Sequence, residues 1–390
     1  MFSLLLAIIY VAFISLGLPD SLLGSAWPAM RVQFGAPVSF AGVISMIIAG
    51  GTIVSSLMSD RMTRKLGAGL VTAVSVGMTA VALLGFSLSG SLWMLCLWAI
   101  PYGLGAGAVD AALNNYVALH YAARHMSWLH CFWGVGASIS PYIMSACLSG
   151  GAGWQSGYRT VFYIQIVLTA ALFLSLSLWK NRKSGEEQEE AAAIGLKGAL
   201  GIPGVPYMLV AFLCYCAMEA TTGLWASTYL VEARHVSAET AARFASLFYL
   251  GITFGRFVNG FVADHMGDKR LIRLGTVVIL LGTVLIMLPV QTEKLALAGL
   301  MMIGLGCAPI YPSIIHATPN NFGKENSQAI VGIQMASAYT GSTFLPPLFG
   351  VLASQVSVGL YPFFLALFAA LLLLMTEKLN RLNRAKEQRG

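Results

Sequence analysis

Three acidic residues of this 390-residue chain lie where a charge is costly. Asp20, Asp110 and Glu219 are each flanked by a turn or more of mostly apolar residues. A charge near the centre of a membrane-spanning helix costs about 2.5–3.5 kcal/mol, so such an acid must face water, be paired or carry a proton. Burial favours the protonated form of a carboxyl group, which suits proton uptake and release. We therefore predict that Asp110, Asp20 and Glu219 serve proton coupling, with Asp110 as the carrier.

An ion pair with a basic neighbour is the alternative explanation for a buried acid. Arg256 is the only Lys or Arg that lies more than a few residues inside a predicted span, and it lies towards a helix end. One base cannot neutralise three acids, so we expect at least one of them to act in transport. Asp20 would couple the substrate to the proton, and Glu219 would shape the site or sense a cationic substrate.

Aromatic and amide side chains within the spans are candidates for the wall of a binding cavity around these acids. Aromatic faces and neutral amides suit a sugar ring, whose C–H faces stack and whose hydroxyls need donors and acceptors. For any single aromatic residue, helix packing or interfacial anchoring is an equally good explanation, and His130 could simply bond a neighbouring helix. The predicted substrate-binding residues are Asn114, Asn115, His130, Trp27, Trp133, Trp225, Tyr311, Gln334 and Tyr339, with Trp128, Gln165 and His316 as further cavity-wall candidates.

The elements that must position these residues are membrane-spanning helices. The chain is 57% hydrophobic and 10% charged, with a mean hydropathy of +0.75, whereas soluble domains carry about 25% charged residues. Apolar runs recur from Met1 to Leu379, each long enough to cross the ~30 Å hydrocarbon core. The run from Leu365 to Leu374 is apolar at every position, unlike the alternating strands of a barrel. The composition excludes a soluble enzyme and predicts an all-α membrane protein.

Twelve spans account for the apolar runs, and the basic residues between them set the orientation. Seventeen of the 23 Lys and Arg fall on the side of both termini. The positive-inside rule therefore predicts cytoplasmic termini, and we expect a multi-pass protein of the bacterial cytoplasmic membrane that acts as a monomer. The predicted spans are at about 3–30, 38–58, 67–90, 92–120, 126–149, 158–179, 205–231, 240–264, 271–290, 295–317, 326–352 and 357–377.

A long polar stretch divides the spans into six and six. The predicted parts are an N-terminal half (1–179), a cytoplasmic linker (180–204), a C-terminal half (205–379) and a cytoplasmic tail (380–390). The halves repeat at a nearly constant offset, as three pairs show: Asp20 with Glu219, Asp60 with Asp264, and Gly103 with Gly304. Duplicated six-span halves around a midplane site are typical of secondary transporters.

The segment from Gly260 to Arg270, GFVADHMGDKR, resembles the GxxxD-x-x-G-x-K/R loop signature of the major facilitator superfamily. The first-half copy differs, because Ser56 and Thr63 stand where the family has glycines. Carboxylates and cations at such turns can pair with each other and with helix ends, which latches one state. The predicted cytoplasmic gate consists of Asp60, Arg61, Arg64, Asp264, Lys269 and Arg270.

Within that superfamily, further segments are similar to the fucose-permease branch of sugar–proton symporters. The glycine-rich run GLGAG at 103–107 leads to Asp110 and Asn114, and LHCFWGVGA at 129–137 precedes Pro141. The resemblance implies that Asp20 and Asp110 are the coupling acids. The chain departs from the branch in having Asp at 110 instead of Glu, Asn115 in place of a common proline, and the additional acid Glu219.

The sequence thus predicts a major facilitator fold of twelve helices in two pseudo-symmetric halves. The predicted function is proton-coupled uptake of a small neutral sugar or polyol by alternating access, with sodium as the alternative coupling ion. The alternatives are a proton-antiport exporter of hydrophobic or cationic compounds and, from another class, a lipid flippase. Neither a nucleotide-binding P-loop nor a HExxH or GxSxG motif occurs. The basic residues form short clusters between spans, so we expect no nucleic-acid partner. The six cysteines have no paired CxxC spacing, and we expect neither a metal nor a cofactor.

Overall fold

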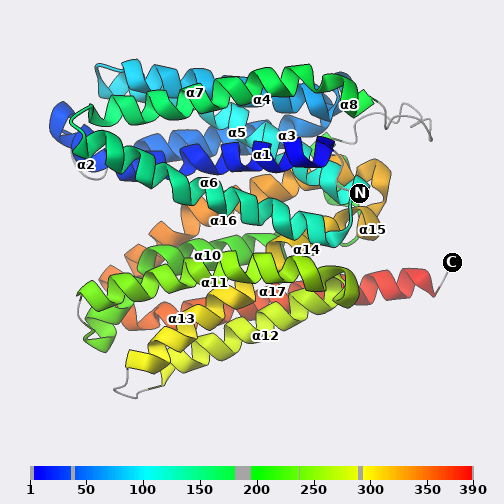
Figure 1. The fold of residues 1–390 in the computed structure, drawn as a ribbon. Coiled ribbons are helices and arrows are strands. Elements are labelled where there is room, and N and C mark those ends of the chain that lie inside the picture. The colour runs from blue at the N-terminus through cyan, green and yellow to red at the C-terminus, as the bar shows by residue number, and fades with distance from the viewer. Residues whose placement is uncertain (1–3, 37–39, 181–194, 237, 289–292, 389–390) are drawn as a thin grey trace. The chain divides into compact units, whose positions relative to one another are not determined.

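The computed structural model describes residues 4–36, 40–180, 195–236, 238–288 and 293–388, and every regular element in these ranges is a helix (Figure 1). The helices are α1 Leu4–Asp20, α2 Leu22–Phe34, α3 Phe40–Leu66, α4 Ala68–Leu88, α5 Leu92–His120, α6 Ala123–Ser149, α7 Gly153–Leu174, α8 Leu176–Lys180, α9 Gly195–Gly201, α10 Val205–Arg234, α11 Ala238–Met266, α12 Asp268–Met287, α13 Glu293–Cys307, α14 Ile310–His316, α15 Thr318–Phe322, α16 Lys324–Gln355, η1 Val358–Leu360 and α17 Tyr361–Glu387. The predicted all-helical fold is confirmed.

The chain forms two compact units. Unit 1 consists of Met1–Tyr116 and Leu129–Ile194, and unit 2 of Val117–Trp128 and Gly195–Gly390. The division falls within the predicted linker, except that the segment between α5 and α6 clusters with the second unit. Residues 181–194 of the linker lie outside the described residues, while α8 and α9 flank them.

Ten segments of the described chain are long and apolar enough to cross a membrane. Each lies on one of the twelve predicted spans. The other two predicted spans are α11, with 29 residues, and α16, with 32 residues. At 1.5 Å per residue they are about 44 and 48 Å long, so they have the length for a crossing but a more polar composition.

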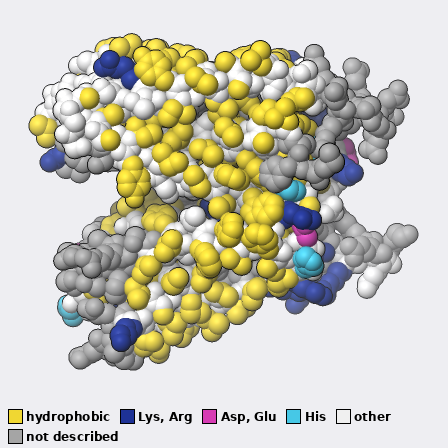
Figure 2. Space-filling model, viewed as in Figure 1, with side chains coloured by type: hydrophobic (Ala, Val, Ile, Leu, Met, Phe, Trp, Pro, Cys, Tyr) yellow, Lys and Arg dark blue, Asp and Glu magenta, His cyan; other side chains and the backbone are white. Residues whose placement is uncertain are grey.

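Lipid-facing surface accounts for the many large apolar side chains exposed in both units. Trp93, Tyr142 and Leu174 have 79%, 78% and 84% of their surface exposed. In water such exposure would be unfavourable, whereas in a bilayer these side chains contact lipid tails. Figure 2 shows hydrophobic side chains over much of the visible surface of each unit.

The first predicted span, 3–30, corresponds to one crossing segment, Leu4–Trp27, which is interrupted at Ser21 between α1 and α2. Pro19 lies inside α1 and has no N–H to donate to the Ser15 carbonyl one turn earlier. The Gln165 side chain of α7 donates to that carbonyl instead, at 2.7 Å. The break is thus stabilised by a neighbouring helix.

A second proline produces a matching arrangement in α6. Pro141 leaves the Ala137 carbonyl without its usual helical donor. The hydroxyl of Ser21, at the break between α1 and α2, donates to this carbonyl at 2.5 Å and lies 2.9 Å from the hydroxyl of Ser140. Side-chain donors therefore satisfy both proline-freed carbonyls, and they tie α1, α6 and α7 together.

The predicted repeat has a counterpart in close helix contacts at matching positions. A Cβ on Gly103 of α5 would lie 2.2 Å from the carbonyl oxygen of Ile48 in α3. A Cβ on Gly304 of α13 would lie 2.2 Å from the carbonyl oxygen of Phe248 in α11. Only glycine allows backbones to approach so closely. Helices α3 and α5 of unit 1 therefore cross as α11 and α13 of unit 2 do.

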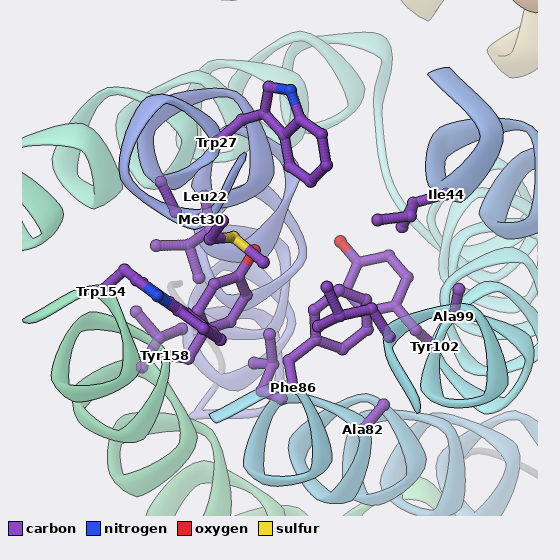
Figure 3. Packing of buried hydrophobic residues seen from close by; sticks show 14 of the residues in the cluster. Leu22, Trp27, Met30, Ile44, Ala82, Phe86, Ala99, Tyr102, Trp154 and Tyr158 are labelled. Carbon is purple, nitrogen blue, oxygen red and sulfur yellow. The ribbon is translucent and has the colours of Figure 1, made fainter. Parts of the chain in front are cut away.

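An apolar cluster beyond the break fixes α2 within unit 1. Figure 3 shows Leu22 and Met30 of α2 near Trp154 and Tyr158 of α7, and Trp27 belongs to the same cluster. Trp27 is 5% exposed and stacks on Phe40, with ring centroids 6.5 Å apart. This packing orients α2 after the break and so fixes the direction in which the chain leaves Asp20.

Candidate functional site

Asp20 is an accessible carboxylate that two neutral aromatic donors hold in place. Trp133 Nε1 of α6 donates to Oδ2 at 2.9 Å, and the Tyr102 hydroxyl of α5 donates to Oδ1 at 3.3 Å. The residue is exposed and lies at the last position of α1, beside the break. It can therefore contact a solute directly while both oxygens stay hydrogen-bonded.

Asp110 is an enclosed carboxylate in a chain of hydrogen bonds. Asn114 Nδ2, one turn further along α5, donates to Asp110 Oδ1 at 2.7 Å. Asn114 Oδ1 in turn lies 3.1 Å from His130 Nε2 of α6. All three residues are buried, and the ring of Phe13 lies edge-on to the imidazole, with centroids 5.5 Å apart. A carboxyl, an amide and an imidazole are thus linked in series between two helices.

Helices α5 and α6 each contribute one group near each acid, because Tyr102 and Trp133 donate to Asp20, whereas Asn114 donates to Asp110 and is itself in contact with His130. On α6, His130 and Trp133 are three residues apart and share one face. On α5, Tyr102 and Asp110 are about two turns apart, so they also lie on one stripe. Helix α6 packs closely on α1, because a Cβ on Gly136 of α6 would lie 2.1 Å from a carbonyl oxygen of α1. The two acids therefore lie along one helix interface of unit 1.

Glu219, the third predicted coupling acid, forms an ion pair in unit 2. Arg256 of α11 lies with its Nη2 3.3 Å from Glu219 Oε1, and the two side chains are 5% and 24% exposed. The Tyr215 hydroxyl also contacts the guanidinium group and donates to the Cys307 carbonyl at 3.0 Å. The sequence placed Arg256 within a span but did not assign it to Glu219. Pairing neutralises the charge that Glu219 would otherwise present.

The predicted binding residues of unit 2 lie in different environments. Tyr311 packs on Phe212, with centroids 4.7 Å apart, and its hydroxyl donates to Met335 Sδ at 3.3 Å. Gln334 is buried and accepts from the Thr318 hydroxyl at 3.1 Å. These contacts serve packing as well as they would serve binding.

Several other predicted wall residues have contacts that explain them structurally. Trp225 donates from Nε1 to the Pro346 carbonyl at 2.9 Å, and Gln165 braces the α1 break. Trp27 belongs to the apolar cluster described above. Asn115 is buried and Tyr339 half-buried, on α5 and α16 respectively.

The sequence suggested that the first-half gate residues lie in a turn, but the structure places them within helix α3. Helix α3 continues to Leu66 and ends before Gly67, which has φ +80°. Asp60 is buried and accepts from Arg64 Nε at 2.8 Å, one helical turn away, while Arg61 is exposed. Because Thr63 replaces the glycine of the signature, nothing terminates the helix there, and it runs about one turn further past Asp60 than α11 does past Asp264.

The second-half gate residues lie at a turn, as predicted, but their partners differ from the expected ones. Asp264 forms an ion pair with the Arg124 side chain and accepts from the Arg124 backbone N–H at 3.1 Å. His316 Nδ1, predicted to line a cavity, lies 2.8 Å from Asp268 Oδ2 at the start of α12. Lys269 and Arg270 are exposed in the same turn.

Further contacts attach the segment Val117–Trp128 to this end of unit 2. Asn259 Nδ2 donates to the Ser127 hydroxyl at 2.6 Å, and the Trp128 ring lies edge-on to Phe261, with centroids 5.5 Å apart. Ala123 packs in an apolar cluster with Ala263 and Leu271. Trp128, predicted to line a cavity, therefore anchors this segment.

Sequence reasoning missed four residues that organise these sites: Arg256 as the partner of Glu219, Tyr102 as a donor to Asp20, and Arg124 and Asn259 at the end of unit 2. Arg256 had a detectable signal, because a lone base inside a span needs an acid. Tyr102 had none, because its role depends on the break at Pro19, which brings an α1 residue to an α5 hydroxyl.

The chain belongs to the Major Facilitator Superfamily, whose profile matches residues 9–292 and 207–389. Members of this family are secondary transporters, so the protein is a multi-pass membrane transporter and not an enzyme.

Individual proteins resemble the chain along nearly its whole length. An uncharacterized transporter, y4wD of Sinorhizobium fredii, is 24% identical over 91% of this chain and 92% of its own. The glucose/mannose transporter GlcP of Bacillus subtilis is 22% identical over 95% and 94%. The crystal structure of the fucose:proton symporter FucP of E. coli superposes with a TM-score of 0.75 at 16% identity, covering 96% and 98%. Relatives named for nitrate and for glucose 6-phosphate match at 25% and 28% identity, so the names do not agree on one substrate.

Proposed function

We propose that the protein is a proton-coupled symporter that takes up a small neutral sugar or polyol. Asp110 carries the proton, and Asp20 contacts the substrate. The observation that carries this proposal is the contrast between the two acids of unit 1. Asp110 is enclosed and bonded through neutral groups, whereas Asp20 is accessible and flanked by two aromatic donors.

The chemistry around Asp20 supports a hydroxylated substrate. A carboxylate accepts hydrogen bonds from sugar hydroxyls, and the faces of Trp133 and Tyr102 suit the C–H faces of a sugar ring. The names of GlcP and FucP agree with this chemistry. The relatives named for other substrates do not, so the support comes chiefly from the residues.

The exporter of cationic compounds is the weaker candidate on electrostatic grounds. It relies on Glu219 to attract a cation, but Arg256 lies 3.3 Å from that carboxylate and compensates its charge. The pair also argues against an anionic substrate, because the buried guanidinium already has a carboxylate partner.

In the proposed cycle, the predicted halves 1–179 and 205–379 expose the site alternately to the two sides of the membrane, joined by linker 180–204. Both termini, including tail 380–390, face the bacterial cytoplasm, as the distribution of Lys and Arg indicates. Fusing a reporter that is active only in the cytoplasm to the C-terminus tests this orientation, and an inactive but expressed fusion would contradict it.

A ligand screen tests the substrate class first. Purified protein is heated with D-glucose, D-mannose, L-fucose, a disaccharide or tetraphenylphosphonium, since a ligand at 100 times its Kd stabilises the folded state by about 2.7 kcal/mol. We expect stabilisation by a monosaccharide that is lost in Asp20→Asn. Stabilisation only by the lipophilic cation, lost in Glu219→Gln but kept in the exposed control Glu232→Gln, would replace the symporter with the exporter.

Proton movement tests the coupling. In de-energised proteoliposomes, inward flow of the sugar identified above should acidify the lumen. Asp110→Asn should reduce proton-driven accumulation about tenfold or more, equivalent to ~1.4 kcal/mol, while sugar exchange without net proton movement continues. Alkalinisation would indicate antiport, and sugar flow without any pH change would indicate uncoupled or sodium-linked transport.

A further inference from the structure

The exposed stripe of α17 changes from apolar to basic within about one helical turn. Its large exposed side chains recur at helical spacing, as Phe363, Leu367 and Leu374. The same stripe continues with Lys378 and Arg381, and both are exposed. About 6 Å of helix separates Leu374 from Lys378. The stripe that contacts lipid tails along most of α17 therefore ends in two cations.

Helix α12 shows the same change along its own exposed stripe. Leu274, Val277, Leu281 and Val284 are exposed at helical spacing. Arg270 lies one turn before Leu274 in the same stripe and is exposed. Figure 1 shows that α12 begins at the end of unit 2 at which α17 ends. The two stripes therefore become basic at the same end of the unit.

An ion pair between the two helices sets their register. The guanidinium group of Arg273 on α12 contacts both carboxylate oxygens of Glu377 on α17, with Nη2 2.8 Å from Oε2. Along α12, Arg270 lies about 4.5 Å from the level of this pair towards the end of the unit. Along α17, Lys378 and Arg381 lie about 1.5 and 6 Å from that level in the same direction. All three bases therefore lie at similar depth, and the apolar stripes lie on the other side of the pair.

The three bases are available to an anion. Within the described part of the chain, neither Arg270 nor Arg381 forms an ion pair. Lys378 Nζ lies 5.7 Å from the ring centroid of Tyr207 in α10. Such a contact orients an ammonium group but leaves its charge in place.

The described acids of α12 and α17 at this end already have partners. Glu377 pairs with Arg273, and Asp268 Oδ2 lies 2.8 Å from His316 Nδ1. Neither carboxylate is therefore free to compensate the three exposed bases. The surface made of Arg270, Lys378, Arg381 and the two apolar stripes, named here the α12–α17 surface, combines unbalanced positive charge with an apolar face.

We propose that the α12–α17 surface binds one anionic phospholipid. The phosphate oxygens accept hydrogen bonds from the guanidinium and ammonium groups, while the acyl chains lie along the exposed side chains of α12 and α17. Basic groups at the membrane surface attract anionic headgroups in this way. A headgroup that carries its own cation loses much of this attraction, because the three bases repel that cation. A soluble phosphate would leave the apolar stripes without a partner, so the occupant is a lipid.

Thermal unfolding of the purified full-length protein in dodecyl maltoside tests the lipid class. The protein is heated with increasing phosphatidylglycerol, with phosphatidylcholine of the same acyl chains, or with glycerol phosphate. A ligand that binds only the folded state raises the unfolding midpoint, so phosphatidylglycerol should raise it and reach saturation. The other two compounds should leave the midpoint nearly unchanged. Equal shifts with the two phospholipids, or the full shift with glycerol phosphate alone, would overturn the proposal.

Variants that remove charge locate the binding. The double variant Arg270→Gln, Arg381→Gln should weaken the apparent affinity for phosphatidylglycerol about tenfold or more, equivalent to ~1.4 kcal/mol. Its midpoint without lipid should stay unchanged, because both side chains are exposed and outside the ion pairs described above. The control Lys65→Gln, Arg159→Gln removes the same charge from exposed positions of unit 1 and should keep the affinity. An affinity that survives in the first double variant, or falls equally in the control, would show that no site exists on the α12–α17 surface.

Discussion

At the residue scale, the three acids have three different environments, since Asp20 is exposed, Asp110 is buried and Glu219 is half-buried. Each environment limits what the acid can do. Asp20 accepts from neutral aromatic donors and is open to a solute. Asp110 is enclosed and accepts from an amide. Glu219 faces a guanidinium and has little net charge to offer. These differences are the reason that we propose substrate contact for Asp20, proton carriage for Asp110 and structural pairing for Glu219.

The Glu219–Arg256 pair should behave as a coupled unit. Removing one partner of a buried ion pair costs about 3–5 kcal/mol, and less here because the Glu219 side chain is 24% exposed. Glu219→Gln should therefore lower the unfolding midpoint clearly. The double variant Glu219→Gln, Arg256→Gln should recover most of that loss, because no uncompensated charge remains. Thermal unfolding of purified protein measures both effects, with Glu232→Gln as the exposed control. Additive losses in the double variant would show that the two groups do not interact.

Sequence alone predicted the residue contacts that depend on spacing along one helix. Asp110 and Asn114 are four residues apart, so any helix brings them together, and His130 was among the candidates. The partners that depend on crossing helices, such as Tyr102 for Asp20, were not predictable from spacing. The structural contact of Gln165 was not predictable for the same reason, since its bond to the Ser15 carbonyl exists only because α1 and α7 meet there.

At the element scale, prolines and their side-chain donors determine where the helices of unit 1 bend. Pro19 and Pro141 each free one carbonyl, and Gln165 and Ser21 each satisfy one. Asp20 lies at the resulting break in α1. A proline in the sequence signals such a bend, but not which residue supplies the missing donor. The position of the bend was therefore detectable, while its stabilisation was not.

A double-mutant cycle tests this account of the α1 break. Gln165→Leu should cost about 1–3 kcal/mol, because the buried Ser15 carbonyl loses its donor. In a Pro19→Ala background the restored N–H of residue 19 can bond the same carbonyl, so Gln165→Leu should cost much less. Unfolding midpoints of the four proteins give the coupling free energy. Equal costs in both backgrounds would contradict the link between Gln165 and Pro19. The thermal shift with sugar, measured on the same proteins, shows whether Asp20 has moved.

The prediction of a turn at Asp60, after the second span, placed the end of α3 too early. The signature suggested a loop at Asp60, yet Thr63 is compatible with a helix, and α3 ends only at Gly67 with its positive φ. The length of a helix beyond the bilayer is set by the first residue that terminates it. Hydropathy does not detect that residue, because polar residues can continue a helix into water.

At the scale of the whole molecule, the repeat organises both units, although their polar sites differ. The same glycine contacts recur in α3 with α5 and in α11 with α13. The sites built on this frame do not recur, since Asp20 has neutral donors where Glu219 has Arg256. The fold could be predicted from sequence because the two halves are duplicated. The sites were predicted incompletely because their polar residues differ between the halves. Within unit 2, the attachment of Val117–Trp128 through Arg124 and Ser127 has no signal in the repeat.

The glycine contacts offer a direct test of structural equivalence between the units. A methyl group on Gly103 or Gly304 would lie 2.2 Å from a carbonyl oxygen of the facing helix, so the helices must separate. Gly103→Ala and Gly304→Ala should each destabilise their unit by about 1–3 kcal/mol, the usual cost of overpacking. Gly50→Ala is the control, because its methyl group meets nothing within 4 Å and alanine is the better helix former by up to about 1 kcal/mol. Denaturant midpoints in detergent should fall similarly for the first two variants and hold or rise for the third. A loss at only one of the two glycines would mean that the duplicated crossings no longer share one geometry.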